Sequence, residues 1–363
     1  MKKILFLTLF IIIITIFPTT AYAADDAYGN IFNSIPDYVK DSFESSEYEI
    51  NSLEDIVSII GQEGIPGIVK LAAAGIKLPF SLMTSVLIIC VIGTALELFI
   101  DRADIRKTAD LVFSVIICAL IIGSLKDLIL SVSDCVTSCG VFMYSFLPVF
   151  ASLLISSSTA FSSVAYTSSA YLFTQFFMFL SKSVITPASI AYFALTLSSS
   201  VADNMFKDLL NGIKNGIIWL LTLITTVFTA ITSVQSVVTS AADSVAVRTG
   251  KYIFGTSIPV VGGYVSEVLN TVIGSVAIMR SSIGLFAIIV IIILFVPVII
   301  KLAAWKIAVK LCVVIVMGSG NGKGIAVIEA FDNVITILLS VMICILIGLI
   351  LSLSAILALG GVK

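Results

Sequence analysis

The 363-residue sequence contains no histidine. Histidine is the commonest metal ligand and the usual general base near neutral pH, so its absence excludes Ser-His-Asp centres, Cys-His centres and histidine-based zinc sites. Charged residues are scarce, at 12% of the chain, against roughly 25% in soluble domains. The net charge is −2 and no Lys/Arg cluster suits a phosphate backbone. We therefore expect no enzymatic activity, no cofactor, no metal and no nucleic-acid partner.

Hydrophobic residues are abundant instead, at 59% of the chain with a mean hydropathy of +1.17. Runs long enough to cross about 30 Å of hydrocarbon predict an all-α, polytopic helical membrane protein with seven or eight transmembrane helices. The predicted spans are 80–100, 111–130, 139–157, 164–181, 184–200, 216–238, 283–300 and 334–358. Two further segments, 264–280 and 302–318, are predicted as embedded or interfacial helices, and each would shift the topology by one crossing.

The amino terminus has the composition of a secretory signal peptide over residues 1–23. Two lysines precede an apolar run, and an Ala-Tyr-Ala site follows at 21–23. The alternative is an uncleaved membrane anchor. Residues 24–77 form an acidic segment, predicted to be extracytoplasmic, with a capped amphipathic helix near 52–60. Its acidic face is either a solvated surface or a docking surface, and residues 78–363 form the multi-span transmembrane domain.

Three basic clusters agree with one topology if the mature chain starts outside the cytoplasm. The positive-inside rule places Lys and Arg on the cytoplasmic side. Counting spans forward puts all three clusters there and the carboxyl terminus outside; they are Arg102, Arg106 and Lys107, then Lys207 and Lys214, then Lys301, Lys306 and Lys310.

A polar stretch from 235 to 280 interrupts the apolar pattern. Ionisable groups near a bilayer core need partners, water or a functional role. The turn at 258–263 contains Pro259, Gly262 and Gly263, which break a helix. We therefore expect broken or re-entrant helices near 243–280, lying inside protein or beside water.

Polar residues recur at helical spacing on both sides of this turn. One row is Thr225, Thr229, Thr232, Ser236 and Ser240. The candidate polar path or packing face consists of Gln235, Thr239, Asp243, Lys251, Glu267, Asn270 and Arg280. Two interpretations stay open: these side chains pack helices together, or they line a cavity or pore.

Two other motifs are set aside. The run 318–324 resembles a phosphate loop but lacks its first glycine and its final Ser or Thr, so a flexible turn is predicted. Cys135 and Cys139 are four residues apart and are predicted to be structural, because no C-x-x-C or metal spacing exists.

The central block resembles the stage III sporulation protein AE family of endospore-forming bacteria. The residues that carry the resemblance are Gln235, Asp243, Lys251, the Ile-Pro-Val-Val-Gly-Gly turn at 258–263, Ser266, Gly284 and Pro297. The signal peptide, the acidic segment and the order of spans are also similar. The family has no catalytic residues to carry over.

The resemblance implies a multi-pass protein of the mother-cell membrane facing the forespore, within a channel complex needed for late forespore gene expression and development. It also implies sibling stage III sporulation membrane proteins of the same operon as partners, with a homo-oligomer possible. Two alternatives remain: a stand-alone secondary transporter with a midplane site at the broken helices, and a non-conducting assembly scaffold.

Overall fold

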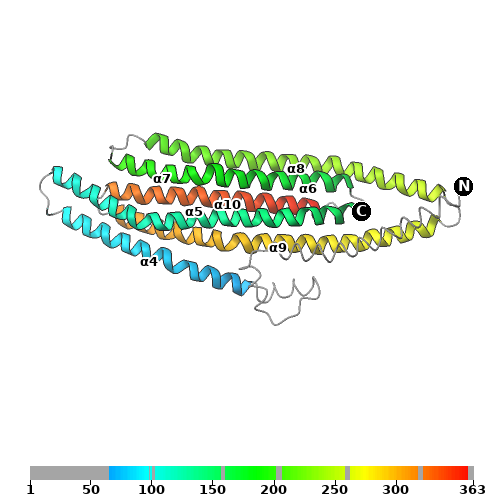
Figure 1. The fold of residues 1–363 in the computed structure, drawn as a ribbon, viewed down its shortest axis with the longest axis horizontal. Helices are drawn as coiled ribbons and strands as arrows, with labels where there is room; N and C mark the ends of the chain where they lie inside the picture. The colour runs from blue at the N-terminus through cyan, green and yellow to red at the C-terminus, as the bar shows by residue number, and fades with distance from the viewer. Residues whose placement is uncertain are drawn as a thin grey trace.

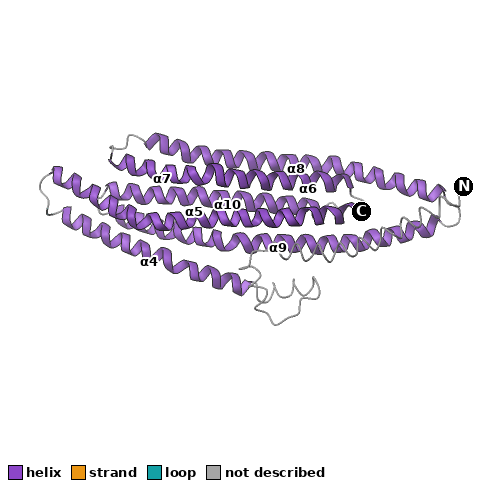
Figure 2. Cartoon of the chain, viewed as in Figure 1, coloured by secondary structure: helices purple, strands orange, loops and turns teal. Residues whose placement is uncertain are grey.

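The computed structural model describes residues 65–97, 99, 103–156, 160–201, 207–257, 262–317 and 322–358. These ranges contain helices and no strand (Figures 1 and 2). The elements are α4 (Ile65–Glu97), α5 (Ala103–Ser156), α6 (Ala160–Leu180), the π-helical turn η2 (Ser181–Ile185), α7 (Thr186–Val201), α8 (Lys207–Ser257), α9 (Gly262–Met317) and α10 (Gly322–Ala358). The predicted signal peptide, the helix near 52–60 and Pro259 lie outside the described residues.

The prediction of an all-helical membrane protein is confirmed, but the described residues hold six candidate membrane spans where the sequence predicted seven or eight. The predicted spans 111–130 and 139–157 belong to one helix, α5. The polar residues between them lower the hydropathy without breaking a helix, because they include neither proline nor a glycine pair.

The predicted spans 164–181 and 184–200 are also continuous, through η2. Pro187 lies one residue into α7 and has no backbone N–H to donate. The π-helical turn accommodates this change: the backbone N–H of Thr186 bonds to the carbonyl oxygen of Ser181, and the Thr186 hydroxyl donates to the same oxygen at 2.9 Å. A π-bulge therefore replaces the loop that the sequence predicted.

The central stretch differs from the prediction as well. α8 runs without interruption to Ser257. α9 is one 56-residue helix that contains 264–280 and residues 302–317 of the other predicted segment. Broken or re-entrant helices were predicted near 243–280, and the described parts of that range belong to two long helices. A helix boundary does fall at the predicted turn, because α8 ends at Ser257 and α9 begins at Gly262 and Gly263.

The helices form an elongated bundle with α10 near its centre (Figure 1). α10 contacts α5, α6, α7, α8 and α9. Large side chains fill the interior: Trp305 of α9 meets Phe331 of α10 edge to face, with ring centroids 5.4 Å apart. On α6, Phe173 packs against Phe228 of α8, with centroids 4.0 Å apart. The core of the described bundle is therefore closed by packing.

Five of the helices contain a stretch of at least 20 residues without Asp, Glu, Lys or Arg. These stretches are 135–156, 160–181, 215–242, 281–300 and 334–358. They lie side by side, because Phe173 reaches both Phe228 and Gly348. Gly284 also lies against Leu357, and Gly140 lies against Met178. At about 1.5 Å per residue, 20 residues match the roughly 30 Å hydrocarbon core. We call this part of the bundle the charge-free layer.

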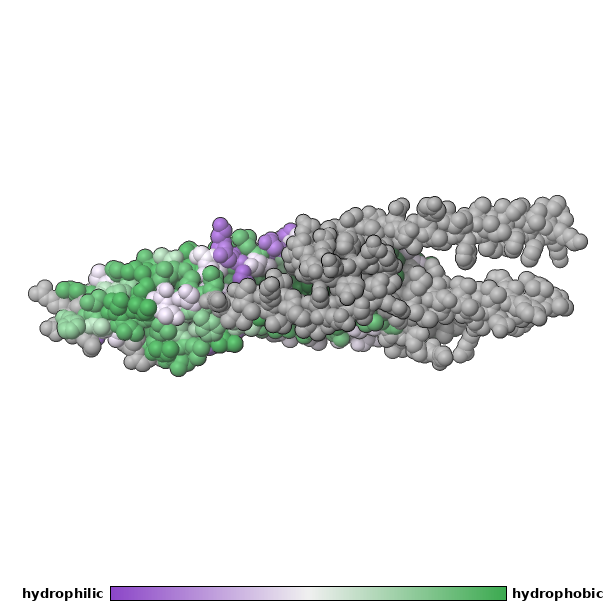
Figure 3. Space-filling model, turned by 90° about the horizontal axis from the view of Figure 1, so that it is seen from below, coloured by the Kyte–Doolittle hydropathy of each residue, from purple (hydrophilic) through white to green (hydrophobic). Residues whose placement is uncertain are grey.

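Hydrophobic residues cover most of the described surface on the face seen in Figure 3, with hydrophilic residues gathered in a small patch. Many large apolar side chains are exposed, for example Val115 (65%), Leu172 (66%) and Val314 (69%). A soluble protein would not leave so much apolar surface uncovered, so this surface fits a lipid environment.

Candidate functional site

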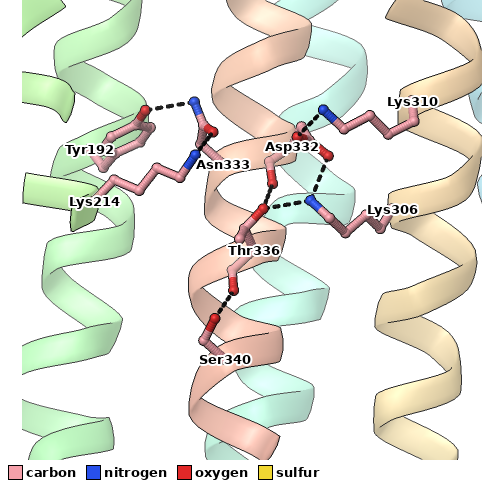
Figure 4. A network of polar contacts seen from close by, with 8 residues as sticks. All are labelled: Tyr192, Lys214, Lys306, Lys310, Asp332, Asn333, Thr336 and Ser340. Atoms are coloured by element: carbon pink, nitrogen blue, oxygen red, sulfur yellow. Dashed lines mark hydrogen bonds and ion pairs between the residues drawn. The ribbon is translucent and has the colours of Figure 1, made fainter. Parts of the chain in front are cut away.

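An ion-pair cluster joins α9 to α10 at one side of the charge-free layer (Figure 4). Asp332 of α10 binds two lysines of α9: its Oδ1 is 3.0 Å from Lys306 Nζ, and its Oδ2 is 3.0 Å from Lys310 Nζ. The two lysines are four residues apart and share a helical face. Lys306 also donates to Thr336 Oγ1 at 2.6 Å, and Thr336 donates to the carbonyl oxygen of Asp332 at 2.8 Å.

The next residue of α10 extends the cluster to another side of that helix. Asn333 accepts a hydrogen bond from Lys214 Nζ of α8 at 2.7 Å. Its amide nitrogen donates to the Tyr192 hydroxyl of α7 at 2.9 Å. The neighbours Asp332 and Asn333 thus point to different helices, as the roughly 100° rotation per residue requires. Figure 4 shows the whole network, which we call the polar clamp: Tyr192, Lys214, Lys306, Lys310, Asp332, Asn333, Thr336 and Ser340.

Burial differs strongly between the charged members of the polar clamp. The Asp332 side chain is 8% exposed, Lys306 is 30% exposed and Lys310 is 60% exposed. A buried carboxylate needs a paired charge and hydrogen bonds to be tolerated, and Lys306 is the more shielded of its two partners. Lys310 serves as a second, more hydrated partner. The cluster therefore fixes the register of α9 on α10.

A related contact lies between α9 and α5, where Lys301 Nζ donates to Ser131 Oγ at 2.9 Å. Together with the polar clamp, this contact links α5, α7, α8, α9 and α10 through polar side chains. These contacts lie on the side of the charge-free layer where α7 and α9 end. Among the described residues, no group of three Asp, Glu, Cys or His side chains is placed to hold a metal ion.

Sequence reasoning missed the polar clamp. It assigned Lys214, Lys306 and Lys310 to cytoplasmic clusters and gave Asp332 no role. A signal was present: two lysines four residues apart in one apolar run, and an Asp-Asn pair in the next. Ionisable residues inside apolar helices are functional or structural candidates by default.

The predicted polar path is described only in part. Gln235 lies on α8 and exchanges hydrogen bonds with Ser169 of α6, at 2.9 Å and 2.7 Å. Thr239 donates to the carbonyl oxygen of Gln235 at 2.7 Å. In the other row, Thr232 is buried where Tyr166 of α6 donates to its carbonyl oxygen. The Gln235 side chain and the Tyr166 hydroxyl thus join α6 to α8, whereas the Thr239 hydroxyl bonds within α8.

For the other members of the predicted path, the structure describes the helix that each belongs to but not its side chain. Asp243 and Lys251 belong to α8, and Glu267, Asn270 and Arg280 belong to α9. The structure does not describe whether these side chains meet, so their role stays a prediction.

The two neighbouring cysteines are buried and free. Cys135 donates from its sulfur to the carbonyl oxygen of Leu294 at 3.3 Å, which ties α5 to α9. This contact fits the structural role predicted from the sequence.

Comparisons with known proteins agree with one family. A family model described as stage III sporulation protein AE (spore_III_AE) matches residues 46–360. The chain is 22% identical over 275 residues to stage III sporulation protein AE of Bacillus subtilis (strain 168), over 76% of this chain and 69% of that protein. No solved structure matches the chain.

Proposed function

Because this chain belongs to the stage III sporulation protein AE family, we propose that it is an integral membrane component of the channel complex between mother cell and forespore. In this proposal it is needed for late forespore gene expression and development, and it carries out no chemistry of its own. The match over residues 46–360, together with six candidate membrane helices, is the observation that supports the proposal.

The proposed location is the mother-cell membrane facing the forespore, with the acidic segment 24–77 outside the cytoplasm. The helix order supports this orientation, because α4, α7 and α9 end, and α5, α8 and α10 begin, at the same end of the described bundle (Figure 1). Basic residues accompany each of these pairs of helix ends: Arg102 and Arg106, Lys207 and Lys214, and Lys310 and Lys323. The positive-inside rule assigns that end to the cytoplasm.

The packed interior of the described bundle limits where a conduit could run. Phe142, Phe146 and Phe150 of α5 are fully buried in the described bundle, as are Trp305 and Phe331. We therefore place a conduit between this chain and its neighbours, either further copies or sibling membrane proteins of the same operon, rather than along the axis of one bundle.

The scaffold alternative is favoured by one contact, the Gln235–Ser169 pair, which uses a predicted path residue for helix packing. A scaffold conducts nothing but must still assemble. The transporter alternative places a midplane site at the broken helices near 243–280. The described parts of that region belong to two long helices, α8 and α9.

The test is gene deletion and complementation in the spore-forming host. Deletion should stop late forespore reporter expression, and the wild-type chain should restore it. Affinity purification from sporulating cells should recover the sibling membrane proteins with the wild-type chain. Normal forespore expression in the deletion strain would refute the proposal. Variants that keep co-purification but lose expression would support a conduit, whereas joint loss of both would support the scaffold.

A further inference from the structure

Two tyrosines and a glutamine lie on the outward side of α5 and α6, inside the charge-free layer. Tyr144 of α5 packs against Tyr171 of α6, with ring centroids 5.4 Å apart. Gln175, one turn further along α6, donates to the Tyr171 hydroxyl at 3.2 Å. Tyr171 is 44% exposed, Gln175 is also exposed, and Tyr144 is half-buried. We call these three residues the tyrosine seam.

The tyrosine seam lies deep in the layer rather than at its border. Tyrosine is common at the membrane–water interface, where its hydroxyl reaches water. Tyr144, however, follows the nearest charged residue of its helix, Asp134, by ten residues, which is about 15 Å at 1.5 Å per residue. The Tyr144 side chain is thus near the middle of a hydrocarbon core about 30 Å thick, too deep for an interfacial aromatic.

The polar groups of the seam are not satisfied by their own helices. A serine or threonine hydroxyl in a helix donates to a carbonyl one turn back, as Thr137 and Ser145 do on α5. Among the described residues, by contrast, no donor reaches Gln175 Oε1, and no acceptor takes the hydroxyl proton of Tyr144 or Tyr171. Hydrocarbon offers no partner, so these groups require water or another polar side chain.

α9 shows how a surface suited to lipid differs from this one. Residues 283–300 cross the same layer and include no serine, threonine, asparagine, glutamine or tyrosine. The outward side of α5 instead carries polar side chains at helical spacing, from the border of the layer past its middle. They are Asp134, Thr137, Tyr144, Ser145 and Ser152, and all are exposed or half-buried.

We infer that the outward side of α5 and α6 borders a water-filled space within the membrane, whereas α9 faces lipid. A packed neighbour would need a polar partner at each level of this row, but water supplies one at every level. The tyrosine seam carries an amide and two phenols and no charge, so the space suits water and small polar solutes. Asp134 and Lys182 are both exposed at the border of the layer nearest the polar clamp.

This inference rests on the proposed function and deepens it. The core of the described bundle is closed, so a conduit runs between this chain and its neighbours. The tyrosine seam marks the face of this chain that lines the conduit.

The test is thiol accessibility in the full-length chain with its cysteines removed, in opened membranes of sporulating cells. A small, membrane-impermeant methanethiosulfonate reacts with the thiolate, which forms in water and not in hydrocarbon. We expect Gln175→Cys and Ser145→Cys to react about ten-fold faster than two controls, Leu172→Cys and Ile292→Cys. Leu172 is an exposed residue of α6 outside the seam, and Ile292 is half-buried on α9, as Ser145 is on α5.

The same four variants in detergent should react at similar rates, which shows that each thiol is chemically available. Fast reaction of Gln175→Cys and Ser145→Cys in the membrane, with slow reaction of both controls, supports the inference. Slow reaction of all four in the membrane overturns it, because protein or lipid then covers the seam. Equal reaction of all four in the membrane overturns it as well.

Forespore reporter expression tests the proposed function separately. Normal expression in the deletion strain refutes the proposed function, whatever the labelling pattern. If expression requires the chain but Gln175→Cys and Ser145→Cys react no faster than the controls, the inference about the seam fails and the proposed function stands.

Discussion

Replacing Asp332 by asparagine should destabilise the bundle more than any single change to the lysines that bind it. The substitution keeps the size of the side chain and removes its charge. Lys306, 30% exposed, then loses its only described carboxylate. Leaving one partner of a buried pair unpaired costs about 3 to 5 kcal/mol, and we expect about 3 because Thr336 still accepts from Lys306.

The two lysines should contribute unequally. Lys310 is 60% exposed, so Lys310→Gln should cost less than about 1 kcal/mol, as exposed ion pairs do. Lys306→Gln should cost about 2 kcal/mol, because Asp332 stays buried with one hydrated partner. Lys182→Gln is the matched control on an exposed lysine of η2, and it should be nearly neutral.

The assay is reversible unfolding of the purified chain in mixed micelles, with a double-mutant cycle for each lysine against Asp332→Asn. The coupling free energy with Lys306 should be near 2 kcal/mol and that with Lys310 below about 1 kcal/mol. Equal coupling of both lysines, or a stable Asp332→Asn variant, would refute the assignment of Lys306 as the main partner.

Three further outcomes are expected. Gly348→Ala should destabilise the chain by about 2 kcal/mol, because its Cβ meets the Phe173 ring, whereas Gly123→Ala should be neutral or slightly stabilising; the same micelle unfolding assay separates them. Gln235→Leu should cost about 1 kcal/mol and leave forespore reporter expression intact, and loss of expression in a stable variant would argue for a polar path instead. In a cysteine-free chain, Val245→Cys should react with a membrane-impermeant thiol reagent and Val227→Cys should not. On α8, Val227 lies within the charge-free layer and Val245 lies beyond it. Equal labelling of the two cysteines would contradict this placement.

The sequence was sufficient to predict helices and membrane insertion, because these depend on composition along one segment. It was not sufficient to predict where helices end. The polar residues at 131–138 and 181–183 look like loops by hydropathy, yet α5 and the α6–η2–α7 segment continue through them. A helix in a bundle satisfies its own backbone, and polar side chains can turn towards neighbouring helices.

The candidate site was harder to predict because its contacts join distant parts of the chain. Asp332 binds lysines on a different helix, and Gln235 bonds to a serine 66 residues earlier. No single-sequence pattern gives such pairings. A lysine near the end of an apolar run is equally typical of a cytoplasmic flank, so the sequence alone does not distinguish a topology signal from a buried ion pair at Lys306 and Lys310.

The length of α9 has a mechanical consequence. Its first residues run beyond the end of α10, as Figure 1 shows, while Lys306 is held in the polar clamp near its other end. Gly284 lies against Leu357 of α10, so α9 is held in the bundle as far as that residue. From Gly284 to Gly262 the helix measures about 33 Å, at 1.5 Å per residue. A rotation of about 5° at Gly284 would thus swing the tip by about 3 Å, so the first part of α9 is a lever whose fulcrum lies where the bundle packing ends.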